Sequence, residues 1–181
     1  MMKFETREQW LNEAAGRLLV AFFPAAAGRP LKLSFGWPKG SRKAVGECYH
    51  TESSVDHSTH HIFISPKLTL PGDVLHVLLH ELVHAVVGVK EGHRGAFSKA
   101  AKKVGLTKPW TATTPDAELQ AKLGKLSDEL GELPHIGMIP EPKKQTTRMK
   151  LWECSCGMKI RRAGELNARC LECGSNFVLQ G

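Results

Sequence analysis

Apolar residues recur along this chain of 181 residues with spacings that predict four helices and a few short strands. Between residues 6 and 23 they return every three or four positions, which is the period of a helix with one buried face. Thr6, followed three residues later by Gln9, predicts a capping box at the start of this helix. Stretches that favour short strands follow at residues 31–35, 44–49 and 61–64.

The most apolar stretch is a predicted helix over residues 73–88. It is apolar on nearly every side, so we expect it to be buried at the centre of the domain. A further helix is expected over residues 94–104, with its alanines inward and its lysines outward. Thr114 and Pro115 are expected to open the last helix, with proline at the first helical position, and Gly131 ends it.

The composition defines the class of protein and its division into parts. Hydrophobic residues make up 41% and charged residues 24%, which is typical of a globular protein. No apolar run approaches the roughly 20 residues that span a bilayer, and no signal peptide is recognisable, so we expect a cytoplasmic protein without a membrane partner. Helices mixed with short strands predict an α+β fold. A stretch with prolines and lysines near residues 138–148 indicates a linker, which predicts domains at residues 1–140 and 141–181.

Three polar residues interrupt the apolar helix in the pattern His80-Glu81-Leu82-Val83-His84. Residues four apart on a helix lie on the same face, so the two imidazoles can hold one Zn²⁺ ion at about 2.0–2.1 Å. Glu81 can then act as the general base on a water activated by the metal. An ordinary structural role explains one buried histidine, but it is a poor explanation for two histidines and a glutamate together.

A catalytic zinc ion needs a third protein ligand and one open position. His93 is the best candidate, because glycines before it let the chain turn back just where the next helix begins. His76, four residues before His80, is the rival candidate. It lies too far along the helix from His84 to share one tetrahedral ion, so we expect it to pack beside the ligands.

Four of the five cysteines form two pairs near the C-terminus, at Cys154, Cys156, Cys170 and Cys173. Glycine follows each pair, which suits the tight turns that surround a metal-bound sulfur. The four thiolates predict a structural zinc site of the ribbon type, which holds together a segment too small to fold on its own core. Disulfides are the alternative, and the absence of a signal peptide disfavours them.

A second histidine-rich stretch contains Cys48, His50, His57, His60 and His61. Its spacing matches no compact metal site, and serines, a threonine and an aspartate lie between the histidines. We therefore expect a polar loop near the cleft, with Cys48 as an ordinary thiol.

The formal net charge is +7, and residues 141–181 supply +4 of it, because eight basic residues there outnumber four glutamates. One interpretation is sequence-independent binding to DNA phosphates, with Trp152 and Phe177 available for stacking on bases. A merely solvated basic surface is the alternative. The basic residues of this segment are Lys143, Lys144, Arg148, Lys150, Lys159, Arg161, Arg162 and Arg169.

Several motifs of the chain, together with the cysteine cluster, resemble the SprT-like metalloproteases, which are relatives of Spartan, and especially the bacterial and bacteriophage members of that family. They lie at residues 62–66, 80–85, 92–97, 103–106 and 112–113. The sequence departs from the family at Arg94, which separates His93 from Gly95. The resemblance covers about residues 60–181. It implies a zincin-like core with an N-terminal helix, a small and mostly antiparallel sheet, the metal-binding helix and further helices, followed by a zinc ribbon.

By this resemblance His80, His84 and His93 bind a catalytic zinc ion, Glu81 activates water, and the four cysteines bind a structural zinc ion. Residues 1–140 would then be the protease domain, and residues 141–181 the linker and ribbon, of a zinc endopeptidase. The sequence leaves the oligomeric state open, with a monomer as the favoured state. The family removes proteins that are crosslinked to DNA, which implies DNA-associated protein substrates. Two alternatives stay open: a DNA-binding adaptor whose HExxH site is structural or vestigial, and a metal hydrolase that acts on a small amide.

Overall fold

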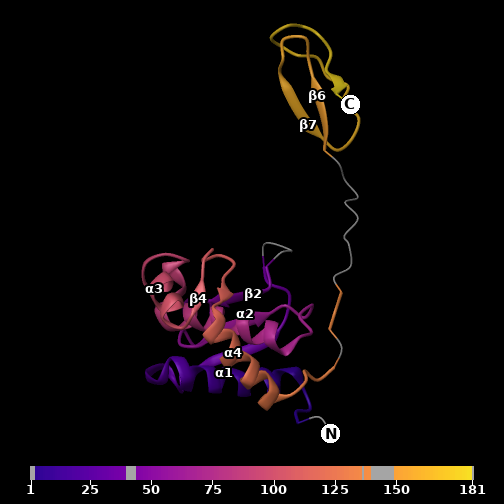
Figure 1. Ribbon diagram of the computed structural model, residues 1–181. Coiled ribbons are helices and arrows are strands. Elements are labelled where there is room, and N and C mark those ends of the chain that lie inside the picture. The colour runs from indigo at the N-terminus through magenta and orange to yellow at the C-terminus, as the bar shows by residue number, and fades with distance from the viewer. Residues whose placement is uncertain (1–2, 40–43, 136, 140–148, 181) are drawn as a thin grey trace. The chain divides into compact units, whose positions relative to one another are not determined.

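The computed structural model describes residues 3–39, 44–135, 137–139 and 149–180. The chain divides into two compact units, residues 1–140 and 141–181 (Figure 1). Helices and small sheets occur together, so the predicted α+β class is confirmed. Within the described residues, no helix is long and apolar enough to cross a membrane.

Four α-helices build the first unit: α1 (Arg7–Phe22), α2 (Pro71–Val87), α3 (Gly95–Lys103) and α4 (Ala117–Leu130). The predicted capping box is present, because Thr6 accepts a hydrogen bond from the backbone of Gln9 and the Gln9 side chain accepts one from Thr6. As predicted, α2 is buried on nearly every side and forms the centre of the unit. Short 3₁₀ turns occur at η1 (Pro24–Ala26), η2 (Thr51–Ser53) and η3 (Val89–Glu91).

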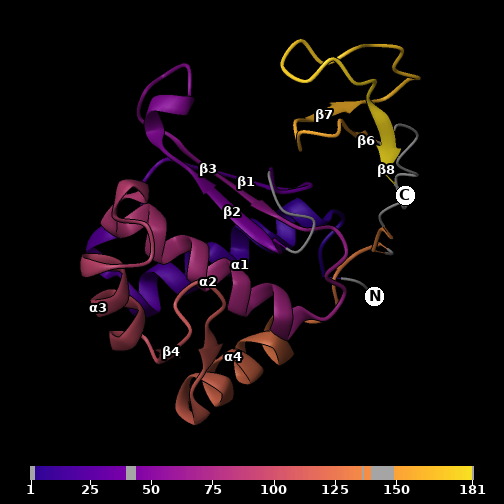
Figure 2. The ribbon, with the colours of Figure 1, turned by 90° about the horizontal axis from the view of Figure 1, so that it is seen from above.

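Three strands form the main sheet: β1 (Leu31–Phe35), β2 (Gly46–Tyr49) and β3 (His60–Ile64), in the order β1-β3-β2. Strand β3 is parallel to β1 and antiparallel to β2, so the expectation of a mostly antiparallel sheet is wrong and the sheet is mixed. The most buried strand, β3, takes the centre, and this leaves β2 at the edge. Spacing along the chain could not show that order, because it depends on long-range pairing. Figure 2 shows the three strands lying side by side above α2.

The last helix of the unit begins later than predicted. Thr114 and Pro115 form the short strand β5 (Thr114–Pro115), which pairs with β4 (Leu106–Thr107). Helix α4 instead starts after Asp116, whose carboxylate accepts a hydrogen bond from the backbone N–H of Leu119 at 2.8 Å. An aspartate that satisfies a free N–H of the first turn is a stronger start signal than a proline one residue before it.

The second unit has one sheet of β6 (Lys150–Glu153), β7 (Lys159–Arg162) and β8 (Val178–Gln180), antiparallel in the order β7-β6-β8. Its small core consists of Trp152, Phe177, Cys154 and Cys170. Both aromatic rings are at least 93% buried, so they are not available for stacking on bases, and that part of the sequence interpretation is wrong. Most of the predicted linker, residues 140–148, lies outside the described residues.

Candidate metal centres

Three imidazoles from two parts of the first unit converge on one point. His80 and His84 lie one turn apart on α2, and His93 lies between η3 and α3. The Nε2 atom of His93 is 3.2 Å from Nε2 of His80 and 3.1 Å from Nε2 of His84. Three ring nitrogens this close together form a group that could hold a metal ion.

Two neighbours that the sequence analysis did not assign to the site hold these rings in place. Thr113 Oγ1 lies 2.9 Å from His80 Nδ1. The hydroxyl oxygen can accept a hydrogen bond from the Nδ1–H group of His80 when Nε2 of the same ring faces a metal. The fully buried Phe97 ring stacks on His84, with a centroid separation of 4.3 Å, and its centroid lies 5.0 Å from those of His80 and His93. No local pattern in the sequence could reveal these contacts, because Thr113 lies 33 residues from His80.

His76 supports the same network from the preceding turn of α2. Its Nε2 atom lies 3.5 Å from Thr113 Oγ1, so the threonine hydroxyl stands between two histidines of one helix. His76 is not a member of the convergent group. This placement agrees with the expectation that it packs beside the ligands.

Burial controls the protonation of the two helical histidines. It lowers the pKa of His80 to about 3 and that of His84 to about 4, with the neighbouring imidazoles as a further cause. Burial also lowers the pKa of the less enclosed His93. Neutral imidazoles are the form that binds metals, so the site is prepared for a cation at neutral pH without first having to lose protons.

Glu81 lies on α2 between the two helical histidines and is 6% exposed. Burial, and secondly the negative charge of Glu47, raise the pKa of Glu81 to about 8, while a hydrogen bond from the Cys48 backbone opposes this shift. Its carboxylate lies close against β2, since a Cβ atom at Gly46 would lie 2.5 Å from Glu81 Oε1. Glycine at position 46 therefore leaves room for this carboxylate.

The three histidines and Glu81 line one cavity of about 460 Å³. The edge strand β2 with the residues before it lines this cavity, and so does the loop that carries Thr111, Ala112 and Thr113. In the described part of the chain β2 pairs only with β3, so no second strand covers its outer edge, although the Cys48 N–H on β2 donates to Glu81. The cavity gives the histidine group access to solvent and to a ligand.

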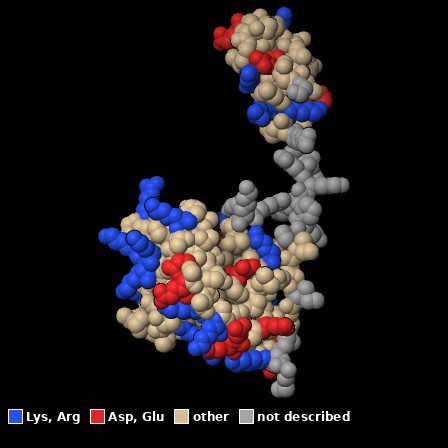
Figure 3. Space-filling view, in the orientation of Figure 1, with Lys and Arg blue, Asp and Glu red and all other residues tan. Residues whose placement is uncertain are grey.

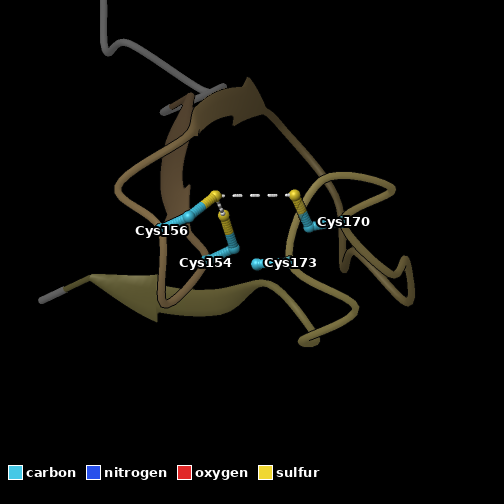
Figure 4. A group of neighbouring side chains, drawn as sticks. All are labelled: Cys154, Cys156, Cys170 and Cys173. Carbon is cyan, nitrogen blue, oxygen red and sulfur yellow. Dashed lines mark hydrogen bonds between the residues drawn. The ribbon is translucent and has the colours of Figure 1, made fainter.

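The four cysteines of the second unit also come together (Figure 4). Cys154 Sγ lies 3.1 Å from Cys156 Sγ, which in turn lies 3.7 Å from Cys170 Sγ. All four Sγ atoms lie within 4.8 Å of one another, and the cysteines are free thiols, so the disulfide alternative has no support here. The group could hold a second metal ion.

Serine hydroxyls surround the most exposed part of this cluster. Cys173 Sγ lies 3.0 Å from Ser175 Oγ and accepts a hydrogen bond from Ser155 Oγ at 3.5 Å. These hydrogen bonds lower the pKa of Cys173 to about 5, which favours the thiolate that metals bind.

The histidine-rich stretch around β2 and β3 forms no such group among the described residues. His60 Nδ1 lies 3.0 Å from the Tyr49 carbonyl, and His61 Nε2 lies 3.2 Å from Ser54 Oγ. Cys48 is buried, and burial followed by the charge of Glu81 raises its pKa. The polar-loop interpretation holds only for the residues between the strands, because Cys48 lies on β2 and His60 and His61 lie on β3, and no histidine of this stretch lines the cavity.

The basic residues of the second unit make mostly local contacts. Lys150 pairs with Glu165 at 2.5 Å, Lys159 lies 3.8 Å from Glu153, and Arg169 donates to the Gly174 carbonyl. Arg161 and Arg162 on β7 are exposed. Lys143, Lys144 and Arg148 lie outside the described residues. The part of the tail that the structure describes therefore offers few cations without a local partner.

Comparisons with models of protein families, with curated proteins and with solved structures found no match to this chain.

Proposed function

We propose that this protein is a zinc-dependent endopeptidase of the SprT-like type, with a zincin-like core and a C-terminal zinc ribbon. The observation that carries the proposal is the convergence of His80, His84 and His93 beside Glu81 at a cavity lined by the edge strand β2. Three neutral nitrogen ligands, a carboxylate and an open side are the parts that a hydrolytic metal site requires.

The histidine group fits zinc in both chemistry and spacing. Bonds of about 2.0–2.1 Å at tetrahedral angles place two zinc-bound nitrogens about 3.3 Å apart. The distances from His93 Nε2 to its two partners, 3.1 and 3.2 Å, are close to that value. Three protein ligands would leave a fourth position, and the cavity that the three histidines line would admit a water or a substrate to the group.

The cysteine group fits a closed structural zinc site. With bonds of about 2.3 Å, tetrahedral sulfur ligands lie about 3.8 Å apart. The contact between Cys156 and Cys170 matches this spacing at 3.7 Å, and the contact between Cys154 and Cys156 is shorter at 3.1 Å. Four thiolates complete the coordination and leave no place for a substrate. Free thiols in this number suit a cytoplasmic location.

A zinc ion bound by the three histidines supplies a Lewis acid that polarises the peptide carbonyl and lowers the pKa of a water. Glu81 takes the proton from that water and returns it to the leaving amine. The positive charge of a zinc ion held by the histidines would lower the pKa of Glu81, which burial raises, so that the carboxylate could accept a proton near neutral pH. Thr113 and Phe97 keep the imidazoles aligned during these transfers.

The substrate is a peptide segment of a protein, with DNA-associated or DNA-crosslinked proteins as the proposed targets. An extended peptide can pair with the outer edge of β2 where the Cys48 N–H does not already donate to Glu81, which brings its backbone along the wall of the cavity to the histidines. This edge favours a polypeptide over a small amide, which would not need it. The cavity also disfavours the alternative of a DNA-binding adaptor with a closed metal site, because all three histidines line the cavity.

The test compares two carboxylates of the same cavity in the zinc-loaded, full-length protein. Glu81→Gln should lower cleavage of a generic unfolded protein and of a DNA-bound protein by about 10²–10⁴-fold while zinc stays bound. Glu47→Gln changes the other glutamate of the cavity wall and should retain most of the activity. If the wild type cleaves neither substrate nor itself, or if Glu81→Gln cleaves as well as Glu47→Gln, the proposal is wrong.

A further inference from the structure

The positive charge of the first unit is concentrated in one segment. Residues 88–108 contain six lysines and arginines against one acid, Glu91, a net charge of +5. The other residues of the unit together carry −2, so the near-balanced charge of the unit as a whole conceals a basic surface. Figure 3 shows lysine and arginine side chains gathered on one side of this unit, over α3.

Helix α3 presents its lysines outward in a regular pattern. Phe97 and Ala101 are buried against the unit, while Lys99, Lys102 and Lys103, spaced at three and four residues, are exposed on the other side. Two further exposed cations flank the helix along the chain, Arg94 directly before it and Lys108 after β4. We call the set the α3 basic surface; it comprises Arg94, Lys99, Lys102, Lys103 and Lys108.

Among the described residues, none of these five cations has an ion pair. Lys90, which lies nearby in η3, differs because it pairs with Glu52 at 2.9 Å. A set of like charges repels itself, and no ion pair of the described residues offsets that repulsion at the α3 basic surface. A surface of cations without ion pairs favours binding of an external polyanion.

The surroundings indicate which kind of polyanion fits. Between residues 71 and 135 the structure shows no large hydrophobic side chain that is exposed. Protein interfaces have an apolar core and are poor in lysine, and helices that lie on membranes insert large apolar residues. Lysine ammonium groups alone suit a row of phosphates. We propose that the α3 basic surface binds the phosphate backbone of a nucleic acid without reading its sequence.

The position of the surface connects binding to the metal site. Helix α3 starts two residues after His93, and Phe97 on its inner side contacts all three imidazoles. A nucleic acid on the outer side of α3 therefore lies on the same element that supports the site. If the proposed peptidase function holds, this places proteins carried by the nucleic acid near the cleft, independently of the C-terminal tail.

The experiment uses three full-length variants that change the net charge equally. Lys99, Lys102 and Lys103 become glutamine in the first, Lys32, Lys122 and Lys125 in the second, and Lys159, Arg161 and Arg162 in the third. Fluorescence anisotropy then measures the affinity for a labelled double-stranded oligonucleotide from about 50 to 200 mM salt. Zinc content and thermal melting establish that each variant is folded.

The α3 variant should bind about tenfold more weakly than the Lys32, Lys122 and Lys125 control, and the slope of log affinity against log salt should fall by about 3, one for each lost phosphate contact. Equal affinities for these two variants overturn the proposal, and so does a loss confined to the Lys159, Arg161 and Arg162 variant. Poly-glutamate or anionic vesicles that compete as well as the oligonucleotide, at matched charge, overturn the nucleic-acid assignment.

The outcome is separable from that of the peptidase proposal. Cleavage of an unfolded protein by the wild type in the absence of nucleic acid tests the peptidase alone. If the wild type cleaves the unfolded protein and the α3 variant binds DNA as well as the control does, only the proposed nucleic-acid surface is rejected. If the wild type cleaves nothing and the α3 variant binds DNA more weakly, only the peptidase proposal is rejected.

Discussion

The two candidate metal sites are built in opposite ways. The histidine site lies on a buried helix, with His80 and His84 less than 10% exposed and Phe97 packed beneath them. The cysteine site lies on turns of a small unit, and Cys156 and Cys173 are exposed. Side chains converge in both places, but an apolar core imposes the convergence in the first unit, whereas the second has a core of only a few residues. We infer that the first unit folds without a metal ion, whereas the second unit needs a bound metal ion in order to fold.

The largest expected effect is the loss of the second unit when one of its thiolates is removed. Cys170→Ser should unfold residues 149–180 and lower the zinc content from about two ions to one, because the core around Trp152 is too small to hold without a metal. Hydrogen exchange measured by mass spectrometry resolves the two units. Protection should disappear from the tail and stay in α2.

Cys48→Ser is the matched control, since Cys48 is also a buried cysteine but lies outside the cluster. It should leave the tail protected. A Cys170→Ser protein with normal tail protection would contradict the proposed contrast between the units.

Removal of one metal-binding histidine from the first unit should abolish proteolytic activity but leave the fold of the unit intact. His93→Ala takes away one of three nitrogens, so zinc should leave and cleavage should be lost, while the helical circular dichroism signal stays. All the described helices lie in the first unit, so this signal reports on it alone. His61→Ala, in the adjacent sheet, should alter neither zinc content nor activity. A loss of helix in His93→Ala comparable to the loss of the tail in Cys170→Ser would remove the distinction between the units.

The sequence predicted the parts of this contrast that depend on local spacing. His80 and His84 meet because four residues make about one turn, and Cys154 and Cys156 meet because they share a tight turn. The sequence did not reveal the edge position of β2, the support from Thr113 or the buried state of Trp152 and Phe177. Each of these follows from packing between distant segments. The start of α4 was missed for a different reason, because the capping by Asp116 outweighed the proline signal.

Acid should destabilise the metal-free first unit. The pKa values of His80 and His84 are lowered from 6.5 to about 3 and about 4, so the unfolded chain binds more protons than the folded one between pH 6.5 and 4. The stability from these neutral histidines is fully present above pH 6.5 and is lost as the pH falls through this range. Glu81 opposes part of this loss, because its pKa is raised to about 8 and the folded unit binds its proton before the unfolded chain does. At pH 5 the expected loss is about 2 kcal/mol for each histidine. Denaturant unfolding after chelation, followed by helical circular dichroism, measures it.

The variant with both His80→Gln and His84→Gln should lose no stability between pH 7 and 5, because the remaining buried carboxyl of Glu81, with its raised pKa, gains a proton in the folded unit over this range. An equally steep loss in that variant would assign the acid sensitivity to other groups.

The smallest effect, and the finest test of how the first unit supports its site, concerns Thr113. Its hydroxyl oxygen lies 2.9 Å from His80 Nδ1, whereas His84 Nδ1 has no hydrogen-bond partner among the described residues and depends on stacking with Phe97. Thr113→Val removes the hydroxyl but keeps the shape, so zinc affinity should fall by about 10–100-fold with little change in helical signal. Competition with a zinc-binding dye measures this affinity.

Thr113→Ser keeps the hydroxyl and should restore most of the affinity. If valine and serine weaken zinc binding equally, the threonine acts through its methyl group and packing, and the hydrogen bond to His80 does not orient the ligand. If neither variant weakens it, the buried rings of α2 and Phe97 suffice to hold the site, and the apolar core imposes the geometry of the first unit even more completely than the contrast with the cysteine site implies.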